Sequence, residues 1–282
     1  MRQPAPHIDY FTASDGYRFA SRIWQADTPI ARIVHVHGII SHGGWYLRLG
    51  RYFASHGFEV HFLDRRGSGL NMEARGDVAD HKVWLDDLEE YLRSQSSSLP
   101  TILLGVSWGG KLAAAFARHR PELLAGFGML CPGLFAKQTP SQIKYAVLSL
   151  ASHVGLQSKR VTIPLQDATL FTDAPAWQEY IRRDPFTLRK ITIRFAVADR
   201  TLTRFATEVP QAIQLPTLCV LAGRDRIVDN DRVKSLLRRL GSESTKLIEY
   251  QESAHTLEFE PDPAAYFQDV CRWIEQLAAT SN

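Results

Sequence analysis

Long apolar runs are missing from this sequence. No stretch approaches the roughly 18 apolar residues that a membrane-spanning helix requires. The first residues, Met1 to His7, also lack the apolar segment of a secretory signal. We therefore expect a soluble, cytoplasmic protein.

Cysteine is scarce, with only Cys131, Cys219 and Cys271 in the chain. An odd number of cysteines in apolar surroundings predicts buried, reduced thiols and not a disulfide framework. The sequence has no CxxC pair. This absence argues against a thiolate metal site.

A charge excess of one sign is also lacking, since 33 Lys+Arg balance 30 Asp+Glu to leave a net charge of +3. A nucleic-acid partner would require basic residues concentrated on one face, so we expect none. The short basic clusters at residues 182–183, 189–190 and 238–239 are interpreted as solvated surface. Nothing in the composition sets the oligomeric state.

The sequence does contain enough apolar residues for a large core, because 45% of its 282 residues are hydrophobic. Apolar runs of strand length alternate with segments of helical periodicity. This alternation predicts an α/β protein with a mainly parallel sheet that helices cover on both faces. Turn residues at 13–16 predict an antiparallel hairpin at the sheet edge, formed by residues 7–12 and 17–24.

Further elements follow from the same patterns. Buried strands are expected at residues 32–36, 59–63, 101–106, 126–130, 217–221 and 246–250, which with the hairpin make an eight-stranded sheet. Helices are expected at residues 45–55, 81–93, 108–118, 229–240 and 263–277.

The alternation stops after residue 133 and resumes at residue 215. Helical signals at 141–151 and 175–182 lie between, without a convincing buried strand, and the stretch is too long for a plain loop. We predict an inserted helical cap at residues 133–208, between core segments 1–132 and 209–282. Core packing, which we favour, and a weak lipid-interface contact both fit the apolar residues of the cap, Ile143, Val147, Leu148 and Leu150.

Ser107 is the candidate nucleophile, in the G-x-S-x-G sequence of residues 105–109. An apolar strand precedes it and an Ala-rich helix follows it, so the serine must lie on a sharp turn where the flanking glycines relieve clashes. Its hydroxyl would then lie at a helix N-terminus, where the dipole favours developing negative charge. The competing interpretation is an incidental N-cap serine in a glycine-rich connection.

A serine nucleophile needs a base, and the base needs an orienting acid. Of the ten histidines, His255 lies in a polar loop after the last strand, at the edge where the serine turn also lies. Asp225 follows the glycine turn after the preceding strand. The chain order Ser107, Asp225, His255 is one that serine triads use. Asp229 is the rival acid, but it better suits the N-cap of the next helix.

Acyl transfer also requires N–H donors aimed at the oxyanion. One predicted donor is the backbone N–H of Trp108, directly after the nucleophile. The other is the backbone N–H of Ile39, in the loop that follows strand 32–36 and begins with His37 and Gly38.

With these motifs in place, the sequence resembles the α/β-hydrolase superfamily and, within it, the monoacylglycerol lipase and lysophospholipase-like group, also called the serine aminopeptidase type. The likeness covers nearly the whole chain. It rests on the serine turn, on His255 and on residues 37–38, 42–46, 64–69, 183–186 and 223–228. It implies the α/β-hydrolase fold and an acyl-enzyme mechanism on esters with an acyl chain, without cofactor or metal.

Some positions depart from that group. The serine turn has Val106 and Trp108 where His and Met are usual, and Ser68 replaces a frequent His. Ser41 and Trp45 stand where the monoglyceride enzymes usually have Glu and Arg, so glyceride specificity does not follow.

Substrate-pocket residues can be predicted from the same positions. Trp108 and Trp45 are expected to make the pocket mouth bulkier and more aromatic, and we place His37 and Trp45 in the substrate pocket.

Three functions stay open. We favour cleavage of a small-molecule acyl ester through Ser107. The same triad also suits amide, thioester or carbon-carbon bond hydrolysis, or acyl transfer, because a fold does not fix a substrate. A non-catalytic ligand receptor is the third hypothesis, and the intact Ser107, Asp225 and His255 argue against it.

Overall fold

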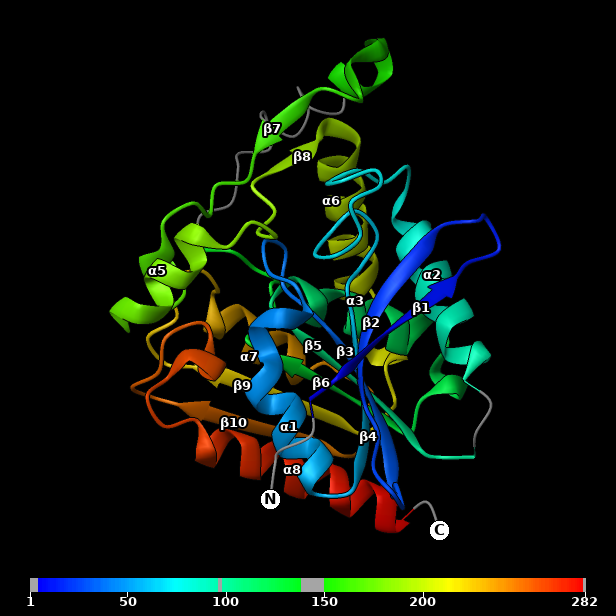
Figure 1. Cartoon of the computed structure of the whole chain (residues 1–282), viewed down its shortest axis with the longest axis vertical. Helices are drawn as coiled ribbons and strands as arrows, with labels where there is room; N and C mark the ends of the chain where they lie inside the picture. Colours follow the sequence, from blue (N-terminus) through cyan, green and yellow to red (C-terminus); the bar gives the residue numbers. More distant parts are fainter. Residues whose placement is uncertain (1–4, 96–97, 138–149, 281–282) are drawn as a thin grey trace.

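The computed structural model describes residues 5–95, 98–137 and 150–280. Its centre is an eight-stranded sheet with the strand order β1-β2-β4-β3-β5-β6-β9-β10 (Figure 1). The strands are β1 (His7–Thr12), β2 (Arg18–Trp24), β3 (Ala31–Val36), β4 (Phe58–Leu63), β5 (Thr101–Val106), β6 (Gly126–Leu130), β9 (Thr217–Ala222) and β10 (Thr245–Tyr250).

Strand pairing in this sheet is mostly parallel. β2 pairs antiparallel with both β1 and β4, and every other neighbouring pair is parallel. The predicted hairpin therefore lies at the sheet edge, and the predicted mostly parallel sheet is confirmed. The central strand β5 has no exposure at Ile102, Leu103 and Leu104, as expected for a strand covered on both faces.

Five helices follow strands of the sheet at nearly the predicted positions: α1 (Leu47–Ser55), α2 (His81–Ser94), α3 (Trp108–His119), α7 (Asn230–Leu237) and α8 (Ala264–Thr280). α1 packs against α8 on one face of the sheet, and α2 packs against α3 on the other (Figure 1). The α2 sequence explains its position, because its buried residues recur at helical spacing along one face.

Two helix boundaries differ from the predictions. Residues 43–46 form the short 3₁₀ helix η1 (Gly43–Tyr46), so α1 begins at Leu47. α7 ends at Leu237, three residues short of the prediction. Asp229 does cap α7, because its Oδ1 accepts from the Arg232 amide at 3.1 Å.

The segment between β6 and β9 is not entirely helical, so that part of the cap prediction is wrong. It contains helices α5 (Pro175–Arg183) and α6 (Ile193–Thr207) and the antiparallel strands β7 (Arg160–Thr162) and β8 (Lys190–Thr192). Short turns of helix complete it: η3 (Ser152–Leu156), η4 (Ala168–Leu170) and η5 (Pro210–Ala212). In Figure 1, β7 and β8 lie at the end of the molecule opposite both chain termini.

α5 was predicted from the sequence, whereas α6 was missed. A signal for α6 was present, because Phe195, Ala198, Leu202 and Ala206 have helical spacing and are all buried. The Thr192 hydroxyl caps this helix by accepting from the Phe195 amide.

The apolar residues of the predicted helix at 141–151 are only partly described. Ile143, Val147 and Leu148 lie outside the described residues. Leu150 is 65% exposed, so core packing is the wrong interpretation for this side chain.

Two expectations from composition can be compared with the structure. All three cysteines are buried and free, as predicted. Among residues 5–95, 98–137 and 150–280, no helix combines the length and the apolar character needed to cross a bilayer.

Candidate active site

Ser107 lies on a strained turn between β5 and α3. Its φ of 53° and ψ of −115° place it in a region that residues with a Cβ rarely adopt. A Cβ on Gly109 would come 2.1 Å from the Val36 carbonyl oxygen, and one on Gly105 would come 2.1 Å from the Gly109 oxygen. Both glycines are therefore required for the close approach of helix and strand.

Backbone hydrogen bonds hold the turn in place. The Ser107 amide donates to Leu130 O at 2.8 Å, and the Gly133 amide donates to Ser107 O at 2.7 Å. Ser107 occupies the N-cap position of α3, but its side chain makes no capping hydrogen bond. Ser107 is thus an N-cap residue by position, but the structure does not give its hydroxyl a capping role.

His255 and Asp225 form a buried pair. His255 Nδ1 lies 2.7 Å from Asp225 Oδ2, and both side chains are almost fully buried. The other carboxylate oxygen accepts from the amides of Ile227, at 2.7 Å, and Val228, at 2.9 Å. Burial alone would raise the pKa of the Asp225 carboxyl, but His255 and these two amides hold it below its usual value. Asp225 is thus ionised and fixes the imidazole ring.

The second ring nitrogen of His255 has no hydrogen-bond partner among the described residues, although it is buried. With Nδ1–H donating to Asp225, Nε2 carries the lone pair, a tautomer assigned from the hydrogen-bond network. Buried imidazole nitrogens normally have a partner. An unpaired basic nitrogen is therefore a group that can accept a proton.

One small cavity contains both Ser107 and His255. Its volume is about 10 Å³, room for about one water molecule. It is lined by Gly38, Ile39, Ile40, Ser41, Trp45, Tyr46, Val106, Ser107, Phe171, His255 and Thr256. The three residues predicted as nucleophile, base and acid are thus brought together, Asp225 through its bond to the imidazole.

A larger hollow of about 510 Å³ lies elsewhere, beside Pro100 and Thr101 at the start of β5. None of the three predicted residues lines it. The small cavity is therefore the better candidate site, despite its size.

The two predicted oxyanion donors flank Ser107. Ile39 lines the cavity, and a Cβ on the adjacent Gly38 would lie 3.3 Å from Ser107 Cβ, so this loop runs directly beside the serine. Trp108 follows Ser107 as the first residue of α3. Within the described part of the chain, neither amide donates to another residue. Both N–H groups are free to bind an oxyanion.

The Trp108 side chain does not enlarge an aromatic pocket mouth, so that expectation is wrong. Its ring is absent from the cavity wall. Instead, Nε1 donates to Asp199 of α6 at 2.6 Å, and the ring packs edge-on against Trp84. Trp108 lies on the buried face of α3, so its indole points toward α2 and α6.

Trp45 lies in the cavity wall as predicted, but His37 does not. His37 is buried behind the loop, where its Nε2 accepts from the Arg65 amide at 3.1 Å. Trp45 is held by the inserted segment, because its Nε1 donates to Asp184 Oδ2 at 2.7 Å.

Asp184 also binds His42, whose Nε2 lies 2.9 Å from Asp184 Oδ2. Burial opposes ionisation of Asp184, but bonds from His42 and Trp45 hold its pKa below the usual value. An ionised carboxylate of the insertion therefore anchors the loop that carries the cavity wall.

Some residues of the site escaped sequence reasoning. The cavity wall includes Ser41, which the sequence comparison had singled out and whose Oγ lies 2.9 Å from the Tyr46 hydroxyl, but also Phe171 and Thr256, which it had not. Thr256 could have been found as the neighbour of His255. Phe171 had no local signal, because it reaches the site only through the folding of the insertion.

The sequence of this chain is similar to those of known proteins along most of its length. The sequence model of the family described as serine aminopeptidase, S33, matches residues 27–262. The chain belongs to this family. The predicted membership of the α/β-hydrolases, in the monoacylglycerol lipase-like group, is thereby confirmed.

Relatives of this S33 family member cover almost its full length. The monoacylglycerol lipase of Mycolicibacterium smegmatis is 26% identical over 94% of this chain and 95% of its own. The phospholipase YtpA of Bacillus subtilis is 26% identical over 90% of this chain and 98% of its own.

A solved structure of a soluble monoglyceride lipase variant from Saccharomyces cerevisiae superposes on this S33 member with a TM-score of 0.85. It shares 19% identity with this chain and covers 98% of it and 97% of its own chain. At this identity the likeness supports the α/β-hydrolase fold alone.

Proposed function

We propose that this chain hydrolyses carboxylic esters through an acyl-enzyme on Ser107, with His255 as general base and Asp225 as the orienting acid. The observation that carries the proposal is the shared cavity, in which a strained serine lies with an imidazole whose other nitrogen is bound to a buried carboxylate. Relatives named monoacylglycerol lipase and phospholipase support an ester substrate with an acyl chain.

The chemistry proceeds in two halves. Ser107 Oγ attacks the ester carbonyl carbon while His255 Nε2 takes the hydroxyl proton. The tetrahedral intermediate then collapses, the bond to the alcohol oxygen breaks, and His255 returns the proton to the leaving alcohol. In the second half, water gives a proton to His255 and attacks the acyl carbon. The bond from that carbon to Ser107 Oγ then breaks, the acid is released, and His255 returns the proton to Ser107. Asp225 stabilises the imidazolium in both halves.

The N–H groups of Ile39 and Trp108 would bind the oxyanion of each tetrahedral intermediate. Removal of one such donor in other hydrolases lowers kcat by about 10²- to 10³-fold. Both donors are backbone groups, so their positions depend on the loop and the turn that carry them.

Substrate entry requires the wall of the cavity to move, because the enclosed space is far below the roughly 300 Å³ of a typical ligand pocket. We propose that residues 133–208 act as a cap that covers the carboxyl edge of the sheet. The cap contributes Phe171 to the wall, where its ring lies 5.9 Å from the His255 ring. Trp45, in η1, is the proposed substrate-pocket residue from the core segment. His37 supports the loop of Gly38 and Ile39 on the side away from the cavity.

A lipid interface is a proposal for the cap surface. Leu150 and Val154 are 65% and 63% exposed, although both are apolar. Activity that rises with liposomes would support this contact, and activity indifferent to them would contradict it.

A cytoplasmic location is likewise proposed, with support from the three buried, free thiols.

Labelling and turnover test the main proposal. The wild-type chain should react with a fluorophosphonate probe and hydrolyse short p-nitrophenyl esters, whereas Ser107→Ala should do neither. An unlabelled wild type, or equal labelling of Ser107→Ala, would remove the proposal. A panel of acyl lengths and head groups, with competing amine and alcohol acceptors, then separates ester hydrolysis from amide or thioester hydrolysis and from acyl transfer.

A further inference from the structure

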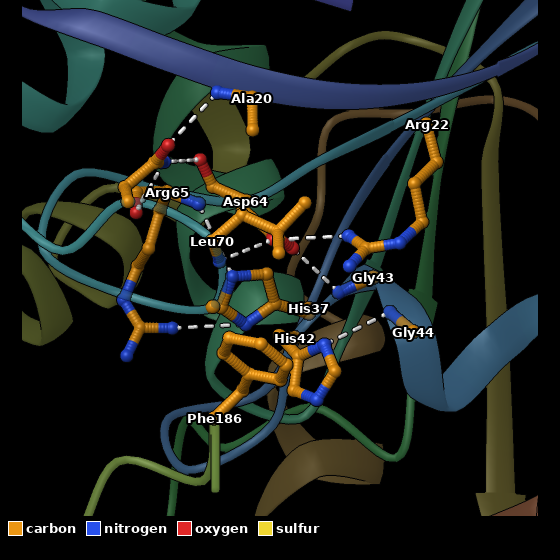
Figure 2. Close-up of polar contacts among 12 residues, drawn as sticks. Ala20, Arg22, His37, His42, Gly43, Gly44, Asp64, Arg65, Leu70 and Phe186 are labelled. Carbon is orange, nitrogen blue, oxygen red and sulfur yellow. Dashed lines mark hydrogen bonds and ion pairs between the residues drawn. The ribbon is translucent and has the colours of Figure 1, made fainter. Parts of the chain in front are cut away.

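Arg65 is a buried cation behind the loop that borders Ser107. It is the second residue after the end of β4 and is only 5% exposed. Its Nη1 donates to Gly38 O at 2.8 Å and its Nη2 donates to Ile39 O at 2.5 Å. Figure 2 shows its side chain reaching the ring of His37, at the start of the same loop. One guanidinium therefore holds two successive carbonyl groups.

This contact fixes the direction of the Ile39 amide. In a trans peptide the C=O of one residue and the N–H of the next point in opposite directions, and the chain has no cis peptide bond among its described residues. Because Gly38 O points to Arg65, the Ile39 N–H points away from Arg65. The Ser107 side chain lies against Gly38, and Ile39 lines the cavity.

The same guanidinium also contacts the side chain of Trp108, the residue after the nucleophile. It lies over the Trp108 ring, with its central carbon 4.7 Å from the ring centroid, and 5.9 Å from the centroid of Phe195. Cation–π contacts of this kind stabilise a buried arginine. Trp108 is one of the positions where this chain departs from its family, and its backbone N–H is the second proposed oxyanion donor.

Arg65 has no carboxylate within ion-pair distance in the part of the chain that the structure describes. Burial lowers the pKa of its guanidinium to about 9, against the opposing charges of Asp199 and Asp64. The group is still a cation at neutral pH, so its charge acts on the two loop carbonyls. A polarised peptide is a stronger N–H donor at its other end.

We propose that Arg65 is a positioning residue that holds one oxyanion donor, the N–H group of Ile39, against Ser107. This inference rests on the proposed function. It assigns to one side chain the alignment of a backbone group in the loop after β3, beside the nucleophile that follows β5.

Kinetics with a tetrahedral analogue test the proposal. In the full chain, Arg65→Met should lower kcat for p-nitrophenyl butyrate by about 10- to 100-fold. This is no more than the loss in kcat that follows removal of a whole oxyanion donor. KM should change by less than about twofold, because the donors act on the tetrahedral state and not on the bound ester. Inhibition by phenylboronic acid, which forms a tetrahedral adduct on serine, should weaken by the same factor as kcat.

Arg66→Met is the matched control. Arg66 is the next arginine of the chain, but it binds Asp15 and Asp87 and does not contact the loop of residues 38–39. We expect this variant to keep wild-type kcat and boronate inhibition, even where its stability falls. Arg65→Lys keeps a cation without the planar fork that reaches two carbonyls, so it should restore only part of the lost kcat.

The outcomes separate this inference from the proposed function. A wild type without esterase activity overturns the proposed function itself. An active wild type with an Arg65→Met variant of equal kcat and equal boronate inhibition overturns only the positioning role. If Arg65→Met does not fold, Arg65→Lys decides, and wild-type kcat in that variant overturns the role as well. If neither variant folds, Arg65 has a purely structural role, and this result also overturns the positioning role.

Discussion

The indole Nε1 of Trp108 donates a 2.6 Å hydrogen bond to Asp199. Trp108 follows the proposed nucleophile, and Asp199 lies in α6 of the inserted segment. The same carboxylate oxygen binds the buried ammonium of Lys111, also at 2.6 Å. One acidic side chain therefore ties the insertion to α3, the helix that begins directly after Ser107.

Asp199→Ala should destabilise the fold by about 3–5 kcal/mol, because it leaves the Lys111 charge buried and unpaired. Asp199→Asn keeps an acceptor for the indole and should cost less. Urea unfolding of both variants gives the comparison. Glu243→Ala, at an exposed position, is the control, with an expected change within about 0.5 kcal/mol. An Asp199→Ala variant as stable as this control would contradict the prediction.

Asp225→Asn should lower kcat by about 10⁴-fold, because an amide favours the wrong imidazole tautomer while it preserves the shape of the site. KM for a p-nitrophenyl ester should change little. Steady-state kinetics of the purified variant measure both constants. A variant that retains more than a tenth of wild-type kcat would remove Asp225 from its proposed role.

Acid stability provides a second measurement on Asp225. Its folded-state pKa lies below the usual carboxyl value, so the stability it contributes is present above the unfolded pKa of about 3.9 and is lost as the pH falls through the lowered value. Asp225→Asn lacks this contribution. The difference in free energy of unfolding between wild type and variant should shrink below about pH 4. A pH-independent difference would speak against an ionised Asp225.

For the contribution of Glu258 to stability, we expect the opposite pH dependence. Glu258 is buried, its Oε1 accepts from the amides of Arg48 and Leu49, and burial raises its pKa to about 8 despite those bonds. Its contribution to stability is therefore full below the unfolded value of about 4.3 and is lost as the pH rises to about 8. Glu258→Gln cannot ionise. Between these pH values, the Tm of wild type should fall relative to that of the variant, and parallel curves would refute the assignment.

Gly109→Ala should disrupt the serine turn. Its Cβ would come 2.1 Å from the carbonyl oxygen of Val36 in the buried strand β3, so the strand or the helix must shift. We expect a loss of about 3 kcal/mol in stability, at the upper end for overpacking, and slow labelling of Ser107 by a fluorophosphonate. Gly57→Ala is the control: its φ is +82°, but among the described residues no atom beyond its two chain neighbours lies within 4 Å of the added Cβ. It should lose about 1 kcal/mol and label normally. Equal labelling rates would contradict the prediction.

The sheet and the proposed catalytic groups could be predicted because their signals are local. Strands such as β5 are short apolar runs between turn residues, and Ser107 is marked by its glycines and by the strand and helix beside it. Parallel strands end at one edge, so the polar loops after β9 and β10 had to bring Asp225 and His255 to the same edge as the serine.

The insertion was harder to predict. β7 and β8 are each three residues long, and such strands have too few alternations to be distinguished from a loop. α6 did carry a helical pattern, but the pattern mixes buried apolar residues with several charged ones and was not recognised.

By itself, the sequence determined the local features of each segment. It showed which segments are apolar enough for a buried sheet, which serine occupies a glycine-flanked turn, and which acid and histidine follow later strands. Only the tertiary structure decided where side chains point. The indole of Trp108 turns to Asp199, the guanidinium of Arg65 turns to the carbonyls beside Ser107, and Phe171 closes the cavity. Periodicity is a property of neighbouring residues, whereas these contacts join residues far apart in the chain, and their partners are selected by packing and by the need to pair buried polar groups.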